Sequence, residues 1–343
     1  FGSQRQSGDL YGIILLPESA TGADIESARR LLIDRGAADA TTLSDMSDAW
    51  QYRSDLTEFK NIDFSSVTNF GSSWFNCASL TTFSVASLPS ATAVNSAWRN
   101  CGSLTSFNTD LPEATNVSDA WLSCSSLSNF GPVDISKGTN FSNAWKSCSS
   151  LTSFASGAKL GTSAQNVRFN SAWHSSGLTS FSTPLPKASN LSAAFRYCTQ
   201  LVSFTLDELP LVTSVSTTWQ STGFQSFSTK LPKISVAYAA WYYNNALVDF
   251  SADVFTNWNP TSIQTGVFNL TWVGCSALSA QSVENILTSI DASGQYATTD
   301  GNSGSNAIND KGIDIDYDGT TLSAATDSAI TSLRGKGWVI FIN

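Results

Sequence analysis

The sequence contains a single histidine, His174, which limits the chemistry that its side chains can perform. Metal sites built from several histidines and acid–base pairs of two histidines are therefore excluded. A Ser-His-Asp triad that includes His174 is formally possible, but the sequence has no Gly-x-Ser-x-Gly turn to accompany it. His174 directly follows Trp173, where comparable segments carry Gln51, Arg99 or Lys146. We therefore predict an exposed polar side chain at this position rather than a catalytic base.

Carboxylates gather in two places that could in principle be functional. A group near the start could supply the pair of acids that a glycosidase needs, but we interpret it as solvated surface; it consists of Asp45, Asp48, Asp55, Glu58 and Asp63. The second group, Asp314, Asp316 and Asp318, matches the first half of a calcium-binding EF-hand loop. The twelfth loop position would be Ala325, which lacks the carboxylate that completes such a site.

We therefore favour a strand over a calcium loop at Gly312–Asp318, with Ile313, Ile315 and Tyr317 facing inward and the aspartates facing outward. The sequence predicts no metal site and no cofactor, and the aspartates remain only a weak candidate for metal binding.

An aromatic residue followed by a small residue at +3, Leu at +6 and Phe at +9 recurs about ten times along the chain. A period near 24 residues is typical of solenoids built from stacked coils. The aromatic residues are Trp50, Trp74, Trp98, Trp121, Trp145, Trp173, Phe195, Trp219, Trp241 and Trp272.

Each repeat combines a turn with a short strand. The spacing of Ala97, Trp98 and Cys101 predicts one helical turn with these side chains on one face. The segment Leu104–Phe107 is rich in Thr and Phe and predicts a short strand with Leu and Phe inward. One repeat is too small to bury its own apolar side chains, so stacked repeats must share a core. The predicted core of the central repeats is Trp74, Cys77, Leu80, Phe83, Trp98, Cys101, Leu104, Phe107, Trp121, Cys124, Leu127, Phe130, Trp145, Cys148, Leu151 and Phe154.

All six cysteines occupy the +3 position of a repeat. Other repeats place Ser, Thr, Gly or Asn there, so no cysteine has a fixed partner, and free Cys packs well as a small apolar side chain. We predict a ladder of reduced, inward-facing thiols; its members are Cys77, Cys101, Cys124, Cys148, Cys198 and Cys275.

The repeat AWxxCxxLTxF, followed by Leu-Pro and an apolar residue before the next Ala-Trp, resembles the BspA-like class of leucine-rich repeats. Those repeats usually have Phe and Ile where this chain has Trp and Phe, and the variant found here is similar to repeats of bacteriophage tail-fibre proteins. The resemblance covers residues 45–280. It implies adhesion and surface recognition rather than catalysis, and it brings no catalytic motif.

We therefore predict an α/β solenoid, a leucine-rich-repeat-like right-handed superhelix with a parallel β-sheet, closed by an α/β cap at each end. Residues 1–44 form the first cap, with a strand at Leu10–Pro17 and a helix at Ala23–Arg35. The repeats occupy 45–280. The second cap, 281–343, contains helices at Ser282–Ile290 and Ser323–Leu333, an exposed loop at Ala292–Asn309 and a final strand at Gly337–Ile342.

Charge and hydropathy narrow the class of partner. The net charge of −9 disfavours nucleic acid and anionic membrane surfaces, and no apolar run approaches the length of a membrane span. The chain begins with Phe1 rather than Met, so its N-terminus is either processed or incomplete. Ser and Thr dominate the polar positions, as is common in virion fibres and extracellular proteins. We therefore expect the protein at a virion or extracellular surface.

Two surfaces are candidates for recognition. Outward strand positions form a row of small hydroxyl side chains, whereas the residues at +1 and +2 after each aromatic are larger and more variable. Within the second set, Arg196, Tyr197, Tyr242 and Tyr243 form our predicted contact patch, since tyrosine is enriched where partners bind.

These observations predict a non-enzymatic recognition or attachment protein, such as a phage tail-fibre or receptor-binding component. A virion structural or decoration protein, or a bacterial BspA-like surface adhesin, is the alternative. The expected partner is a host cell-surface polymer or protein, a neighbouring virion subunit, or a second copy of the chain in a homo-oligomer.

Overall fold

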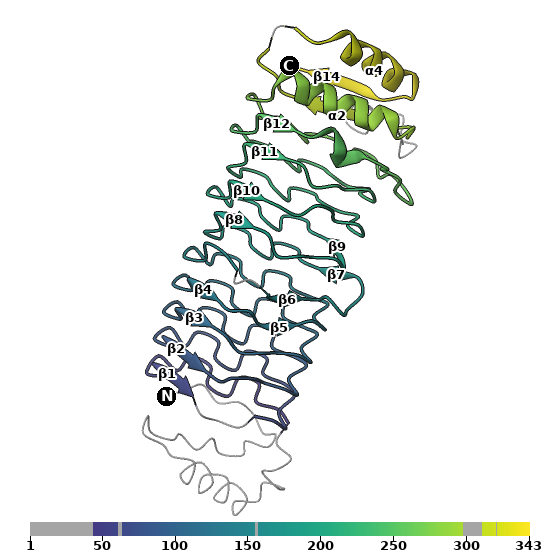
Figure 1. The fold of residues 1–343 in the computed structure, drawn as a ribbon. Helices are drawn as coiled ribbons and strands as arrows, with labels where there is room; N and C mark the ends of the chain where they lie inside the picture. The colour runs from purple at the N-terminus through teal and green to yellow at the C-terminus, as the bar shows by residue number, and fades with distance from the viewer. Residues whose placement is uncertain (1–43, 61–63, 155–156, 298–310, 320) are drawn as a thin grey trace, which may run out of the picture.

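The computed structural model describes residues 44–60, 64–154, 157–297, 311–319 and 321–343. Repeats stack one upon the next into an elongated body, with the helices α2 (Ala280–Ala292) and α4 (Ala324–Gly335) at its C-terminal end (Figure 1). The strand and the helix predicted for the N-terminal cap lie outside the described residues. The same holds for most of the predicted loop at Ala292–Asn309.

Each repeat contributes short strands that pair in parallel with the same strand of a neighbouring repeat. Their register places phenylalanine beside phenylalanine, as in Phe107↔Phe130 and Phe227↔Phe250. The strands are β1 Glu58–Lys60, β2 Thr82–Ser84, β3 Ser106–Phe107, β4 Asn129–Phe130, β5 Asp134–Ile135, β6 Lys159–Leu160, β7 Val167–Arg168, β8 Ser180–Phe181, β9 Ala188–Asn190, β10 Ser203–Phe204, β11 Ser226–Phe227 and β12 Asp249–Phe250.

The predicted helical turn around Trp98 is wrong. In an α-helix each amide would donate to a carbonyl four residues earlier in the same segment. Here the amide of Trp98 donates to Ala120 and that of Asn100 to Leu122, both in the next repeat at 2.8 Å. Ser96 and Asn100 have φ values of 56° and 61°, so the chain reverses by successive tight turns. The amides thereby become a ladder that joins neighbouring repeats.

Aromatic rings form the spine of the core. Successive tryptophan rings stack nearly parallel, with centroids 5.5 Å apart between Trp98 and Trp121 and 5.4 Å apart between Trp121 and Trp145. The strand phenylalanines meet these rings edge-on, as Phe107 does against Trp98 at 4.6 Å. The predicted core side chains are buried, except that Phe154 is half-buried. Such edge-to-face and offset pairs add to the free energy gained by burial alone.

The six cysteines are free and buried. Each thiol donates a hydrogen bond to the backbone carbonyl of the aromatic residue in the preceding repeat; Cys101, for example, reaches the Trp74 oxygen at 3.1 Å and Cys124 reaches that of Trp98 at 3.0 Å. Burial raises the pKa of Cys148 and of Cys275 to about 12. A thiol that is buried, hydrogen-bonded and protonated has little tendency to react.

We expect the six thiols to resist alkylation in the folded protein. Because burial raises the pKa of these thiols, the reactive thiolate is scarce at mildly alkaline pH. The reagent can therefore react only after unfolding exposes a cysteine. Mass spectrometry should show almost no labelling of native, unreduced protein and labelling of all six cysteines after denaturation without reductant. A disulfide-linked peptide in the denatured sample would contradict this arrangement.

The C-terminal part departs from the repeat. The 3-10 helix η2 Ala252–Phe255 is followed by α2 Ala280–Ala292, β13 Gly312–Ile315, α4 Ala324–Gly335 and β14 Val339–Ile342. The helices α2 and α4 agree with the predicted ones, and η2 was not predicted. Strand β13 ends at Ile315 rather than Asp318, and β14 begins at Val339 rather than Gly337. Strands β13 and β14 pair in parallel.

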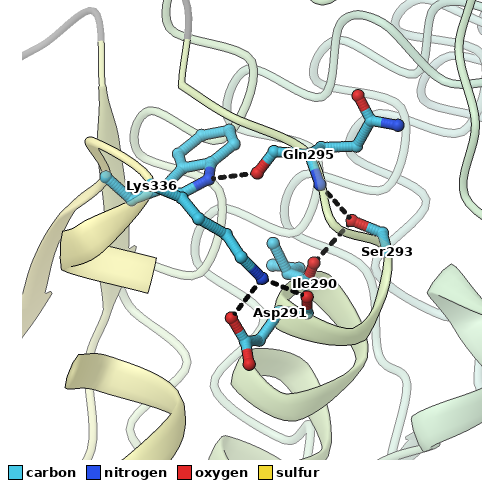
Figure 2. A network of polar contacts seen from close by, with 6 residues as sticks. Ile290, Asp291, Ser293, Gln295 and Lys336 are labelled. Atoms are coloured by element: carbon cyan, nitrogen blue, oxygen red, sulfur yellow. Dashed lines mark hydrogen bonds and ion pairs between the residues drawn. The ribbon is translucent and has the colours of Figure 1, made fainter. Parts of the chain in front are cut away.

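A polar network joins the end of α2 to the turn before β14 (Figure 2). Lys336 donates from Nζ to the backbone oxygen of Asp291 at 2.6 Å and to its carboxylate at 2.7 Å. The Trp338 indole donates to the Gln295 carbonyl at 3.0 Å. A cation at a helix C-terminus pairs with free carbonyls and with the helix dipole. This contact therefore stabilises α2 and links it to the C-terminal end of α4.

Candidate recognition surface

His174 is half-buried rather than exposed, so that prediction needs correction. Its ring lies edge-on to Tyr197, with centroids 5.4 Å apart, and Nδ1 is 2.9 Å from the Ser175 hydroxyl. Burial lowers the pKa of His174, and the positive charges of Lys146 and Arg196 lower it further. The physical reason is stacking: the neighbouring repeats cover each side of the ring. Its hydrogen-bond partner is the Ser175 hydroxyl, and among the described residues no carboxylate bonds to the ring to orient it as a base.

The N-terminal carboxylates serve local contacts. Asp55 pairs with Arg53 and Glu58 with Lys60, and Asp45 accepts a hydrogen bond from the Ser47 amide at 2.8 Å. The Arg53 hydrogen bond lowers the pKa of Asp55 to about 2. Asp63, another member of this group, lies outside the described residues. These contacts fit the interpretation of this group as surface.

Asp314 and Asp316 terminate the ladder of amides. In the last repeat, the Leu270 amide donates to the Asp314 carboxylate at 2.8 Å and the Gly274 amide to that of Asp316 at 2.7 Å. Between them, the Trp272 amide donates to the Asp314 backbone oxygen at 3.2 Å. In earlier repeats the equivalent amides donate to the next repeat, so β13 takes the place of a missing repeat. Both carboxylates are therefore committed to backbone amides.

Among the described residues, no group of three or more His, Cys, Asp or Glu side chains could hold a metal ion. Nor does the described part of the chain contain a helix with the length and apolar character needed to cross a bilayer.

The residues at +1 and +2 after each aromatic form one continuous edge of the stack, which we call the turn ridge. It runs from Gln51–Tyr52 to Val273–Gly274. Each +2 amide except that of Gly274 donates to the +1 carbonyl of the next repeat, as Tyr197 does to Gln220 and Tyr243 to Val273 at 2.9 and 2.8 Å. The ridge is thus a rigid array, and the repeat alone sets the spacing of its side chains.

Tyrosine occupies a costly backbone conformation on this ridge. Every +2 residue has positive φ, and most repeats fill the site with Asn, Ser or Gly, of which Asn and Gly tolerate this conformation best. Tyr52, Tyr197 and Tyr243 adopt the same conformation, with φ of 63°, 60° and 58°. A left-handed backbone costs a bulky residue on the order of 1 kcal/mol. The recurring Asn and Ser were the signal in the sequence that could have revealed this geometry.

The predicted patch lies on the ridge, with one repeat between its two halves. Arg196 places its guanidinium 4.6 Å from the centre of the Tyr197 ring and donates to the Tyr197 hydroxyl at 2.9 Å. The rings of Tyr242 and Tyr243 are 4.2 Å apart. Tyr243 is 52% exposed and Tyr197 41% exposed, whereas Tyr242 is half-buried.

Gly274 makes room for Tyr243. A Cβ atom at position 274 would lie 2.5 Å from the Tyr243 ring, and the φ of Gly274 is 78°. The glycine therefore lets the tyrosine lie across the neighbouring repeat, where its exposed face is held in one orientation.

The strand face offers less for recognition than the ridge, because its outward side chains are short. Hydroxyl groups just before the strands donate to backbone carbonyls of the preceding repeat, as Thr81 does to Thr57 at 2.9 Å and Ser128 to Thr105 at 3.3 Å. These flanking donors are already used within the fold. The turn ridge is therefore the candidate recognition surface.

No protein-family model matches the sequence, and no curated protein matches it. A leucine-rich repeat protein from Bacteroides ovatus, known from a crystal structure, is similar at 13% identity and a TM-score of 0.22, over 68% of this chain and 80% of that one. The chain has a leucine-rich-repeat-like fold of short parallel strand pairs, and its own contacts establish that description.

Proposed function

We propose that this chain is a non-enzymatic recognition and attachment protein, a right-handed solenoid of the BspA-like kind that binds its partner through the turn ridge. The observation that carries the proposal is the placement of Tyr52, Tyr197 and Tyr243 at positive φ, with the rings 60%, 41% and 52% exposed. Other repeats carry Asn or Ser at the same position, so folding does not require tyrosine there. Backbone strain kept at exposed aromatic side chains is a sign of function.

The ridge has the physical properties of a binding surface. Tyrosine provides a large contact area for little loss of side-chain entropy, and here the backbone ladder already fixes its position. Among the described residues, the polar side chains that could act as catalysts are held by local partners, as the contacts of His174 and Asp314 show. Binding therefore accounts for this surface better than catalysis does.

We place this activity at a virion or extracellular surface, in the role of a phage tail-fibre or receptor-binding component. Support comes from the Trp-containing variant of the repeat and from the low fraction of charged residues, 13%. The proposed partner is a host surface polymer or protein. A neighbouring virion subunit or a second copy of the chain would use the same ridge.

The double variant Tyr242→Ser/Tyr243→Ser tests this proposal. We expect the melting temperature to stay within a few degrees, because Ser accepts positive φ at this site in other repeats. Binding, measured on a polysaccharide array and as self-association by sedimentation velocity, should weaken by roughly tenfold or more. Tyr296→Ser is the matched control, since Tyr296 is 66% exposed and lies off the ridge.

Equal binding and self-association by the double variant, the control and the wild type would refute a role of these tyrosines in recognition. Loss of folding in the double variant would shift the test to Tyr197→Ser, which removes one exposed ring without altering the contact with Gly274.

A further inference from the structure

The turn ridge carries a local charge opposite to that of the whole chain. The net charge is −9, yet no +1 or +2 position of any repeat holds Asp or Glu. Arg99, Lys146 and Arg196 occupy three of the +1 positions. Within the described part of the chain, none of these three forms an ion pair. Five cations elsewhere in that part do, among them Lys60 with Glu58, Lys137 with Glu113 and Lys159 with Asp134, while others such as Arg168 and Lys187 do not.

Two of the three cations are held against aromatic rings. Arg196 lies over the Tyr197 ring, and Arg99 lies over the Phe75 ring at 5.6 Å from its centre. Lys146 stands on the other side of His174 from Arg196, and both charges lower the pKa of that histidine. A charge fixed before binding loses less conformational entropy when a partner arrives. The row therefore presents positive groups without acidic partners among the described residues, two of them already positioned.

The spacing of the row is regular. Arg99, Lys146 and Arg196 stand on alternate repeats, since Trp121 and Trp173 begin the repeats between them. Neighbouring strands in a sheet lie about 4.8 Å apart, so these cations recur every ~10 Å along the ridge. Tyr197 and Tyr243 also stand two repeats apart and continue the same period.

We propose that the turn ridge binds an extended acidic polysaccharide, one that carries a carboxylate on about every second sugar. This inference rests on the proposed function and names the class of partner. A pyranose in an extended chain advances by about one repeat of this stack. Alternate carboxylates would therefore meet Arg99, Lys146 and Arg196, and the sugar faces would stack on Tyr197 and Tyr243.

Two other polymers fit less well. A neutral polysaccharide, which the net charge of the chain would favour, leaves the row of cations without partners. Each strand of a DNA duplex carries a phosphate every ~3.4 Å of helix axis, denser than the cations, and the rest of this acidic protein would repel the excess negative charge. The local row and its spacing favour a sparsely charged acidic glycan.

The test compares two triple variants of the full chain that remove the same charge. Arg99→Gln/Lys146→Gln/Arg196→Gln alters the ridge, and Lys60→Gln/Lys137→Gln/Lys159→Gln alters cations elsewhere. The probes, followed by calorimetry, are hyaluronan, which has one carboxylate per disaccharide, its neutral methyl ester, and a single-stranded oligonucleotide. We expect hyaluronan to bind wild type and control alike, to weaken with salt, and to bind the ridge variant at least roughly tenfold less tightly.

Equal hyaluronan binding by the two triple variants would overturn the inference, as would equal binding of the methyl ester or tighter binding of the oligonucleotide. Failure of hyaluronan to bind wild type would also overturn it. The proposed function would still stand if Tyr242→Ser/Tyr243→Ser abolished binding to another array member or self-association. The proposed function would be refuted together with this inference if Tyr242→Ser/Tyr243→Ser behaved as wild type in every binding and self-association measurement.

Discussion

Replacing Trp145 by alanine should lower the free energy of unfolding by about 3–5 kcal/mol, the usual cost of removing a large aromatic side chain from a core. Trp145 is fully buried. Its ring stacks on Trp121 and Trp173 at 5.4 Å on either side and meets Phe130 and Phe154 edge-on. The cavity would open in the middle of the stack, where both neighbouring repeats lose a partner. Chemical denaturation monitored by circular dichroism measures the change.

Trp145→Phe separates the ring from its indole N–H. That N–H is buried without a hydrogen-bond partner within the described part of the chain, so its loss costs nothing in hydrogen bonding. The equivalent position of another repeat is Phe195, which stacks on Trp173 at 4.9 Å. We expect the phenylalanine variant to lose less than about 1.5 kcal/mol. Similar losses for the two variants would mean that the ring does not carry the stacking energy.

Removing both acceptors of the terminal ladder, in Asp314→Ala/Asp316→Ala, should lower the free energy of unfolding by roughly 2–4 kcal/mol. The variant leaves the Leu270 and Gly274 amides without the oxygens that they contact at 2.8 and 2.7 Å. Both sites are partly buried, so water replaces the carboxylates only in part. Thermal unfolding should also show earlier loss of the C-terminal helices than in wild type.

Asp314→Asn/Asp316→Asn is the matched control, because an amide oxygen can accept the same hydrogen bonds without charge. Burial raises the pKa of Asp314, so this group favours the folded state most at acidic pH, and the contribution fades as pH rises through its folded-state pKa. The Asn variant should lack this dependence and keep most of the stability at neutral pH. Stabilisation of wild type by added Ca²⁺, absent in the Asn variant, would instead support a metal site.

The period of the sequence determined the repeat fold. An aromatic residue, Cys, Leu and Phe at fixed offsets can be buried together only if neighbouring repeats cover one another, and this logic predicted the central core before any contact was known. It also predicted that the thiols are free, since no cysteine had a constant partner. The amphipathic patterns of Ala280–Ala292 and Ala324–Gly335 were sufficient for the terminal helices, whose apolar residues recur at helical spacing.

The path of the backbone between these residues was decided by tertiary contacts. The segment around Trp98 has the spacing of a helical turn, but the amides of Trp98 and Asn100 find acceptors in the next repeat, which a single repeat does not contain. The amide between them donates to a carbonyl three residues earlier in the same segment. The same ladder explains why Asp314 and Asp316 bind backbone amides at the open end, where the sequence suggested a partial calcium loop. His174 is half-buried for a similar reason, since neighbouring repeats enclose it.

The sequence by itself determined which residues stand on the turn ridge, because +1 and +2 are fixed offsets from each aromatic. Only the tertiary structure decided that tyrosines there hold positive φ, that Arg99 and Arg196 rest on aromatic rings, and that the cations of this row have no acidic partners among the described residues. The physical reason is that burial and charge pairing depend on neighbours about 24 residues away in sequence but one strand spacing away in space.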